Sequence, residues 1–330
     1  MNNLAVPAWG YWLMGLCLAG FVAMLVISLR RHRGVHRSLY AWPYGLWMVV
    51  FTVIPLLLIG YYAFTDKAGS FTLENFANFW DSNRGMKAEL LAQGFDPELL
   101  GMGARGTVNV DTLVYSLWMA LLCTLISLFL GYPAALIMAD RSFKLGATIV
   151  VLFIIPMWMN FLLRTIAWMS LLEDNGLINS LLKALGFGKV QLMYNSQAVL
   201  LGMVYNFLPF MVFPIYNALS KQDGRLSEAS QDLGANEWKT FWKVTFPISM
   251  PGIVSGITMV FMPSVTTFFI PRVLGGGNTE MFGDLIERTF LTADDWNVGS
   301  ALSLIMMVLI LFSLGLLRRV DPEGEGGSMI

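Results

Sequence analysis

Charged and reactive side chains are scarce in this sequence. Aspartate, glutamate, lysine and arginine make up 13% of its 330 residues, whereas soluble domains carry about a quarter. Both cysteines, Cys17 and Cys123, lie within apolar runs, and the two histidines, His32 and His36, lie in a basic segment. The composition therefore excludes a soluble domain, and it disfavours a disulfide, a Cys/His metal site and catalysis by histidine.

A nucleotide-binding loop is also missing from the sequence. No GxxxxGK[ST] pattern occurs, and the triple glycine Gly275 to Gly277 is not followed by the lysine that such a loop needs. We therefore expect no cofactor or metal on this chain, and we expect any ATP hydrolysis to take place on another chain. The net charge of −1 gives no indication of nucleic-acid binding.

Apolar residues, in contrast, are abundant and occur in blocks. They make up 56% of the chain, and seven runs reach the roughly 20 residues needed to cross a bilayer. The predicted fold is an all-α, polytopic membrane protein with seven spans. The runs are Ala8 to Leu29, Tyr44 to Phe64, Thr112 to Ala139, Leu145 to Leu172, Gln197 to Leu219, Pro251 to Val273 and Val298 to Leu317.

The distribution of basic residues predicts the orientation. The first run is followed by arginines and not by a small-residue cleavage site, which indicates a retained helix and not a signal peptide. More than half of the 21 basic residues lie on short segments at one face, and the positive-inside rule places that face in the cytoplasm. The N-terminus is then outside and the C-terminus inside. These residues are Arg30, Arg31, Arg33, Arg37, Arg141, Lys144, Lys221, Arg225, Lys239, Lys243, Arg318 and Arg319.

A polar island, Leu226 to Pro247, interrupts the apolar runs on the predicted cytoplasmic face. Ser227 is suited to cap one short helix, and Gly234 is suited to end it in a left-handed conformation. Asn236 can cap a second helix with an apolar patch, which Pro247 would end. We expect an exposed helix–glycine–helix unit that docks to a partner; its patch residues are Trp238, Phe241 and Trp242.

The same stretch resembles the EAA loop of type I ATP-binding-cassette importer permeases. Six residues fall on the spacing of that signature, with Ser230 in place of its second alanine. The matching residues are Glu228, Ala229, Gly234, Val244, Phe246 and Pro247. The resemblance implies that residues 221–250 form a coupling loop, in which Glu228, Ala229, Gly234 and Pro247 connect the membrane helices to an ATPase.

Further segments resemble the B-type permease subunit of spermidine/putrescine importers. They are FTLENF, LGYPAALIMA, PMWMNFLLRT, YNFLPFMVFPIY, EASQDLGA and DWNVGSA. The resemblance implies a six-helix transporter unit within residues 41–319. The helix within residues 1–40 and the outer-loop insertion at 82–107 depart from that pattern, and residues 320–330 form a polar, flexible tail.

The resemblance also implies the partners and the mechanism. A soluble binding protein delivers polyamine from outside, a second permease subunit of the C type completes the pathway, and two ATPase subunits, which bind ATP and Mg²⁺, power alternating access. The chain itself is then no enzyme. The location is the inner membrane of a bacterium, with membrane lipid around the helices.

Candidate pathway residues are polar or aromatic groups in or beside the spans. Arg164 is costly at mid-membrane unless it faces a cavity or extends to the surface, and Asn160, one turn away, should share its face. Acids and aromatic rings are the groups that bind ammonium ions. The remaining candidates are Trp158, Glu173, Asp174, Tyr205, Asn206, Asp295 and Trp296, and interfacial anchoring or helix bending is the ordinary alternative for them.

The sequence is also compatible with other transported solutes. A related importer for phosphonate, thiamine or iron would share the loop, and Arg164 is compatible with an anionic solute. An ATPase-independent channel or secondary transporter is disfavoured, because no acid lies deep in any run. A membrane enzyme is disfavoured as well, because the sequence has none of the clustered histidines, cysteines or acids that catalysis would need.

Overall fold

The structure is a computed structural model, and it describes residues 42–82, 106–140, 145–222, 224–277 and 279–320. Within these ranges the chain is helical apart from loops, and an isolated antiparallel bridge between Thr65 and Phe71 is the sole β-pairing. The all-α prediction is confirmed. The predicted helix Ala8 to Leu29, most of the insertion at 82–107 and almost all of the tail at 320–330 lie outside the described residues.

Four helices in the described ranges are long and apolar enough to cross a membrane. They are α6 (Val108–Ala139), α10 (Ser196–Ser220), a continuous helix made of α12 (Glu237–Thr240), η3 (Phe241–Thr245) and α13 (Phe246–Thr266), and α16 (Trp296–Val320). A further apolar stretch runs through α2 (Trp42–Met48), η2 (Val49–Val53) and α3 (Ile54–Ala63). The count of seven spans stays a prediction.

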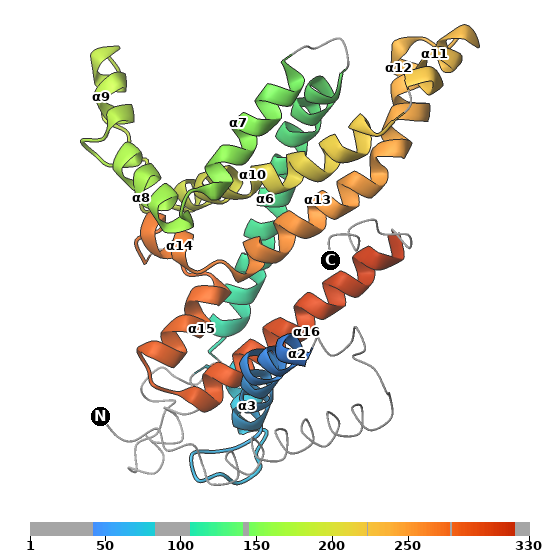
Figure 1. Ribbon diagram of the computed structural model, residues 1–330. Helices are drawn as coiled ribbons and strands as arrows, with labels where there is room; N and C mark the ends of the chain where they lie inside the picture. Colours follow the sequence, from blue (N-terminus) through green and yellow to red (C-terminus); the bar gives the residue numbers. More distant parts are fainter. Residues whose placement is uncertain (1–41, 83–105, 141–144, 223, 278, 321–330) are drawn as a thin grey trace, which may run out of the picture.

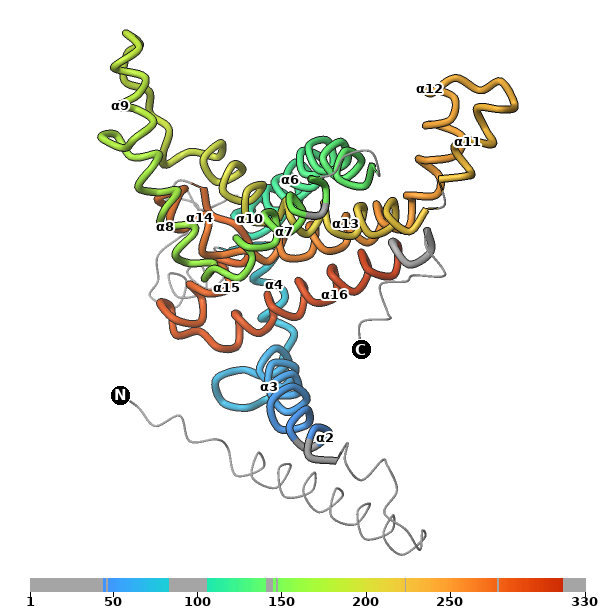
Figure 2. Tube along the Cα trace, turned by 45° about the horizontal axis from the view of Figure 1, so that its top comes forward, coloured from blue at the N-terminus to red at the C-terminus, as the bar shows by residue number. Residues whose placement is uncertain are grey.

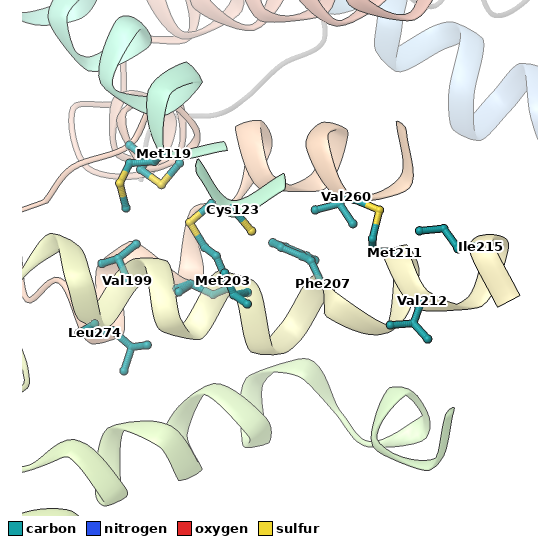
Figure 3. Close-up of a cluster of buried hydrophobic side chains, with 14 of the residues drawn as sticks. Met119, Cys123, Val199, Met203, Phe207, Met211, Val212, Ile215, Val260 and Leu274 are labelled. Atoms are coloured by element: carbon teal, nitrogen blue, oxygen red, sulfur yellow. The ribbon is translucent and has the colours of Figure 1, made fainter. Parts of the chain in front are cut away.

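The core lies where α6, α10 and α13 pack together (Figure 3). Met203 and Met211 of α10 are fully buried there. Two glycines of α13 let the backbones approach: a Cβ at Gly252 would lie 2.7 Å from Pro214 O, and one at Gly256 would lie 2.7 Å from Met211 Sδ. Inside a membrane the hydrophobic effect does not drive helices together, so helix association relies on close packing. Small residues four apart permit such packing.

The molecule has two opposite ends along these helices. Figures 1 and 2 show α12 and α11 (Gly224–Asp232) projecting beyond the other helices at one end. The other end carries α4 (Glu74–Trp80), α14 (Phe269–Leu274) and α15 (Phe282–Leu291). Helices α3 and α16 pack against each other. The predicted coupling loop, residues 221–250, thus lies at the opposite end from Asp295 and Trp296, the predicted pathway residues at the start of α16.

The predicted span Leu145 to Leu172 is broken near its middle, and the two parts together are long and apolar enough for one span. The structure has α7 (Gly146–Trp158) and α8 (Phe161–Leu172), followed by α9 (Leu177–Ala184), and the chain bends by 96° between α7 and α8. Met159 has extended backbone angles, and the Asn160 side chain accepts a hydrogen bond from the Leu162 N–H at 2.8 Å. An N-cap within the apolar run therefore starts a new helix.

Other boundaries differ by smaller amounts. The predicted span Pro251 to Val273 begins earlier in the structure and ends at Thr266, and α14 follows as a separate helix. The segment Phe71 to Phe79 has the composition of a short surface helix, and α4 occupies most of it, from Glu74 to Trp80. Periodicity located these elements, while the turns between them set the ends.

Candidate functional site

The projecting unit formed by α11 and α12, called the knob below, turns at Gly234. This glycine has φ +84°, in the left-handed region, and no atom lies within 4 Å of the position that a Cβ would take. Its N–H donates to Gln231 O at 2.8 Å, and the Ala235 N–H donates to Ser230 O at 3.1 Å. The predicted glycine stop is confirmed, with the hydrogen bonds of a Schellman motif.

The start of the knob differs from the prediction. Helix α11 begins at Gly224, so Ser227 lies inside the helix and does not cap it, and Glu228 is not in the first turn. Glu228 therefore lies outside the first turn, where an acidic side chain interacts favourably with the helix dipole. The second cap is as predicted, because the Asn236 side chain accepts a hydrogen bond from the Lys239 N–H at 2.9 Å.

The outer surface of the knob is apolar as well as polar. Leu233 is 89% exposed and Trp238 is 68% exposed, and Glu228 and Ala229 are exposed beside them. Ser230 Oγ and Thr240 Oγ1, 3.1 Å apart, join the two helices. Exposed large apolar groups on a braced helical unit are typical of a protein-docking surface.

The knob continues into α13 without a break. Residues Phe241–Thr245 form a π-helical turn, in which the Phe246 N–H donates to Phe241 O, and Pro247 stands in the first turn of α13. The prediction that Pro247 ends the second helix is therefore wrong. Proline lacks an N–H and is tolerated where a π-turn has already shifted the hydrogen-bond register.

Arg164 lies near the start of α8 and is buried, with 7% of its surface exposed. Its Nε and Nη1 atoms are buried and have no hydrogen-bond partner among the described residues. Asn160 lies one turn before Arg164, whose N–H donates to Asn160 O at 3.1 Å, but the Asn160 side chain is exposed and caps α8. A buried guanidinium without a counter-charge is costly, so this position favours a carbonyl, water or anion beside it.

The predicted Tyr205–Asn206 patch is divided between two environments. The Tyr205 ring lies 5.1 Å from the ring of Trp168 and is partly exposed. Asn206 is 1% exposed; its Nδ2 donates to Gly202 O at 2.8 Å, and its Oδ1 has no partner in the described ranges. Trp158, at the end of α7, is 86% exposed. Tyr205 and Trp158 are thus available to a ligand or to another helix, and Asn206 is not.

The two acids after α8 lie on the surface. Asp174 Oδ2 is 2.9 Å from Lys189 Nζ, and both side chains are mostly exposed. Glu173 follows the last residue of α8 and is exposed; its carbonyl accepts a hydrogen bond from Asn179 Nδ2. The structure does not bring either acid to Arg164.

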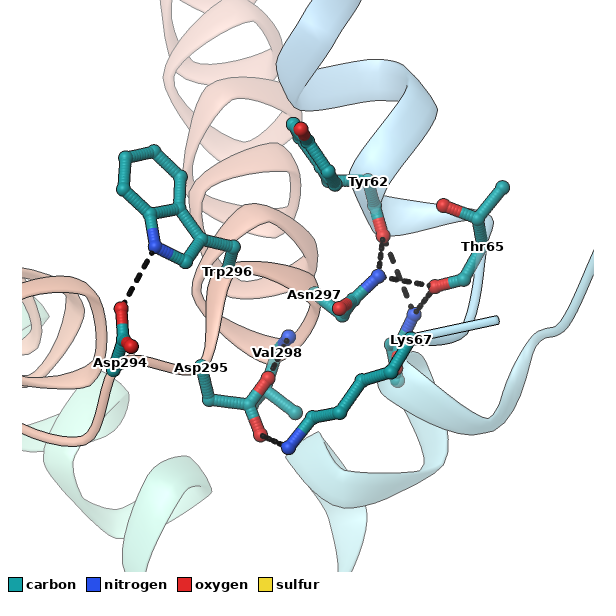
Figure 4. Close-up of polar contacts among 9 residues, drawn as sticks. Tyr62, Thr65, Lys67, Asp294, Asp295, Trp296, Asn297 and Val298 are labelled. Carbon is teal, nitrogen blue, oxygen red and sulfur yellow. Dashed lines mark hydrogen bonds and ion pairs between the residues drawn. The ribbon is translucent and has the colours of Figure 1, made fainter. Parts of the chain in front are cut away.

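Asp295 and Trp296 belong to a polar network at the start of α16 (Figure 4). Asp295 Oδ1 accepts a hydrogen bond from the Val298 N–H, and its Oδ2 is 3.9 Å from Lys67 Nζ. The Trp296 Nε1–H donates to Asp294 Oδ1 at 3.0 Å. Asp295 therefore has a helix-capping role beside any role toward a solute.

Carbonyls at the end of α3 are held by two buried amides. Asn297 Nδ2 donates to Tyr62 O at 3.1 Å and to Thr65 O at 2.6 Å, and Asn75 Nδ2 donates to the same two oxygens at 3.4 and 2.8 Å. We call these four residues the clasp. It joins α3, α4 and α16 through groups far apart in sequence.

Comparison with known proteins decides the family. A family described as "Binding-protein-dependent transport system inner membrane component" matches residues 131–323, more than half of the chain. The spermidine/putrescine transport system permease protein PotB of Haemophilus influenzae is 32% identical over 277 residues, covering 81% of this chain and 88% of PotB. The chain belongs to this family of inner membrane transport components.

More distant relatives agree with this assignment. The inner membrane ABC transporter permease protein YdcU of Escherichia coli is 28% identical over 226 residues, 64% of this permease and 72% of YdcU. A crystal structure of a bacterial ABC transporter that imports alginate superimposes with a TM-score of 0.65 at 16% identity, covering 90% of this chain and 99% of that one. The fold is therefore that of the transmembrane domain of this transporter. The family match and the identity to PotB show that the chain is a transport subunit and not an enzyme.

Sequence reasoning missed two features of the permease. Tyr132 of α6 lies 5.9 Å from the rings of both Phe241 and Phe246, next to the knob. The available signal in the sequence was the glycine directly before it, Gly131, because a small residue in an apolar helix permits close helix packing. The second feature is an ion cluster at the opposite end of the molecule, formed by Arg272, Glu280, Glu287 and Arg288.

The ion cluster links α14 to α15. Arg272 Nη1 donates to both carboxylate oxygens of Glu287 at 2.6 Å, and Arg288 Nη1 lies 3.2 Å from Glu280 Oε1. Burial raises the pKa of the Glu280 carboxyl above its ordinary value, and burial likewise raises the pKa of Asp284. Keeping the carboxyl groups of Glu280 and Asp284 ionised therefore costs free energy, and a cation bound beside them would lower that cost.

Proposed function

We propose that this chain is the permease subunit of an ATP-driven importer that moves polyamines across the inner membrane by alternating access. The observation that carries the proposal is the knob: a braced helix–glycine–helix unit with exposed apolar groups, within a chain 32% identical to a spermidine/putrescine permease. A docking unit of this kind at one end of the helices suits a partner that drives them from that side.

The knob would receive an ATPase. Glu228 and Ala229 are exposed on α11 for contact, Gly234 sets the angle between the two helices, and Pro247 lies where the knob passes into α13. ATP and Mg²⁺ would bind to two ATPase subunits. A soluble binding protein and a second, different permease subunit would complete the importer.

The solute would meet aromatic and acidic groups. The Trp168–Tyr205 pair and Trp158 offer ring faces to ammonium ions. Asp295, with its exposed ion-pair partner Lys67, offers a carboxylate at the start of α16. Glu173 and Asp174 would act only as surface charge, because both are exposed at the end of α8. Asn206 would shape the helix and not touch the solute.

Uptake by the assembled importer tests this proposal. Cells that lack other polyamine uptake should accumulate labelled spermidine or putrescine when this permease is expressed with its ATPase, binding protein and second permease. Loss of uptake in a Walker-lysine variant of the ATPase is the matched control for ATP dependence. Absence of saturable uptake in the intact system would contradict the polyamine assignment.

A second candidate is import of a related anionic solute such as a phosphonate. Arg164 favours it, because its buried Nε and Nη1 have no hydrogen-bond partner among the described residues and would gain from an anion. Competition separates the two: a phosphonate that suppresses uptake through the wild-type complex, but not through Arg164→Gln, would support it. For a polyamine importer, Arg164→Gln should impair the cycle without creating anion uptake.

The orientation is part of the proposal and has its own test. With the knob in the cytoplasm, a single cysteine at Ser227 should resist an impermeant thiol reagent in intact cells and react after permeabilisation. A cysteine at Asp174 should react in both conditions. Labelling of Ser227→Cys from outside would reverse the assignment.

A further inference from the structure

The connection between the knob and the core contains a weak point. Hydrogen bonds in the π-helical turn Phe241–Thr245 span one residue more than those of an α-helix, and Pro247, two residues after the turn, has no N–H to donate. A displacement of α11 and α12 could be absorbed there by bending and never reach the rest of α13. A mechanism that moves the core needs something to stiffen this turn.

Tyr132 spans that turn from another helix. Its ring lies 5.9 Å from Phe241, the first residue of the π-turn, and 5.9 Å from Phe246, the first residue of α13. Its hydroxyl lies 3.1 Å from Ser249 Oγ, one turn further into α13. One side chain of α6 thus contacts both sides of the weak point.

The contacts continue from Tyr132 in both directions. On the knob side, Phe241 packs against Trp238 at 6.1 Å and Trp242 at 5.2 Å. On the core side, the neighbouring Gly131 lies so close to α10 that a Cβ there would be 3.2 Å from Met211 Cγ. A movement transmitted to α6 at this level therefore reaches α10, because closely packed helices shift together.

We propose that Tyr132 is the positioning residue that carries a displacement of the knob across the π-turn, so that α6 and α13 move as one unit. The inference rests on the function proposed above, since it assumes that a partner drives the knob. Two aromatic contacts and one hydrogen bond supply the physical link between α6 and both sides of the turn.

The test compares coupling with assembly in the complete importer, purified and reconstituted in vesicles with its binding protein. Tyr132→Leu removes the ring, Tyr132→Phe keeps it, and Phe129→Leu is the matched control because Phe129 is an exposed ring on the same helix, one turn away. The measured quantities are bound ATPase subunits, ATP hydrolysis and solute imported per ATP.

Tyr132→Leu should retain its ATPase subunits and hydrolyse ATP, while solute imported per ATP falls about fivefold or more. Tyr132→Phe should stay within about twofold of the wild type, because its ring contacts remain, and Phe129→Leu should be unchanged. An unchanged ratio for Tyr132→Leu would overturn the proposal, as would an equal fall in Phe129→Leu.

Two further outcomes are decisive. Should Tyr132→Leu fail to assemble, Phe241→Leu makes the same test from the knob side; if that variant also fails to assemble, the ring pair serves folding and the proposal is wrong. Stimulation of ATP hydrolysis by the binding protein reports coupling without a labelled solute. A wild type that shows this stimulation but imports no polyamine therefore overturns the proposed substrate and leaves the role of Tyr132 standing.

Discussion

The two ends of the permease are built on opposite principles. At one end the clasp binds α3, α4 and α16 through buried amides that share the same carbonyl oxygens. At the other end the knob projects from the helices with Leu233 and Trp238 largely exposed. The clasp satisfies its own polar groups, whereas the knob leaves apolar surface for another molecule.

This difference separates stability from function. A change in the clasp removes hydrogen bonds from the folded chain and therefore lowers its free energy of unfolding. A change in the knob leaves the core contacts of α6, α10 and α13 in place and alters what the chain can bind. Variants of the clasp should therefore change stability and spare partner binding, and variants of the knob should do the reverse.

The largest effect is expected from Gly234→Val. Valine at φ +84° is strained by the backbone alone, since the space around the position is open. The angle between α11 and α12 should change, and retention of the ATPase on the purified permease should fall by about tenfold or more. Co-purification of the ATPase, with membrane insertion of the permease as reference, measures it.

Gly234→Asn is the control for this prediction. Asparagine enters the left-handed region more readily than valine, so this variant should keep most of the ATPase. Normal transport by Gly234→Val, or loss of membrane insertion in the same variant, would contradict the separation of the knob from the core.

The clasp gives the next largest effect, and it is one of stability. Asn297→Leu should lower the free energy of unfolding by about 1 kcal/mol, because Asn75 still serves Tyr62 O and Thr65 O. Asn75→Leu should lower it somewhat more, because Asn75 Nδ2 also donates to the buried Ala63 O at 3.0 Å. The double variant should cost more than the sum, since the carbonyls then lose both donors. Thermal unfolding in detergent measures this, and strict additivity would contradict it.

The same contrast explains what the sequence could predict. The apolar runs located α6, α10 and α16 within a few residues, because a long hydrophobic helix needs only its composition. The glycine turn and the Asn236 cap were predicted from local chemistry and are present. The break at Asn160 was not predicted, because one capping residue hardly changes the composition of an apolar run. The broken run and an unbroken span therefore look alike in the sequence.

The site was predicted less completely than the fold. Its knob could be read from spacing, since all of its residues are neighbours in sequence. The clasp and the Tyr132 contacts join residues up to 235 positions apart, and helical periodicity carries no information about such pairs. The sequence indicated that a charged Arg164 within an apolar run costs free energy. Only the structure shows that the side chain is buried and that its Nε and Nη1 have no hydrogen-bond partner among the described residues.

A smaller effect distinguishes the two possible roles of Asp295. Asp295→Asn keeps an oxygen to accept from the Val298 N–H, so the unfolding free energy should change by less than about 1 kcal/mol. If the carboxylate attracts the solute, the apparent KM for labelled spermidine should rise a few fold. Lys67→Gln is the matched control, because removing the cation should lower the KM. Equal changes in both variants would restrict Asp295 to the ion pair.

The smallest effect is expected at the ion cluster of α14 and α15. Burial raises the pKa of Glu280, so the folded chain binds a proton there more tightly than the unfolded chain does. The proton's contribution to stability is therefore present at low pH and is lost as the pH rises through the raised pKa. Glu280→Gln, which is permanently neutral, should raise the Tm by about 1–2 °C at neutral pH, and the gain should vanish as the pH falls toward the ordinary glutamate range. Glu287→Gln should not reproduce the gain, because this carboxylate accepts two hydrogen bonds from Arg272. A lower Tm for Glu280→Gln at neutral pH would show that its attraction to Arg288 outweighs its burial.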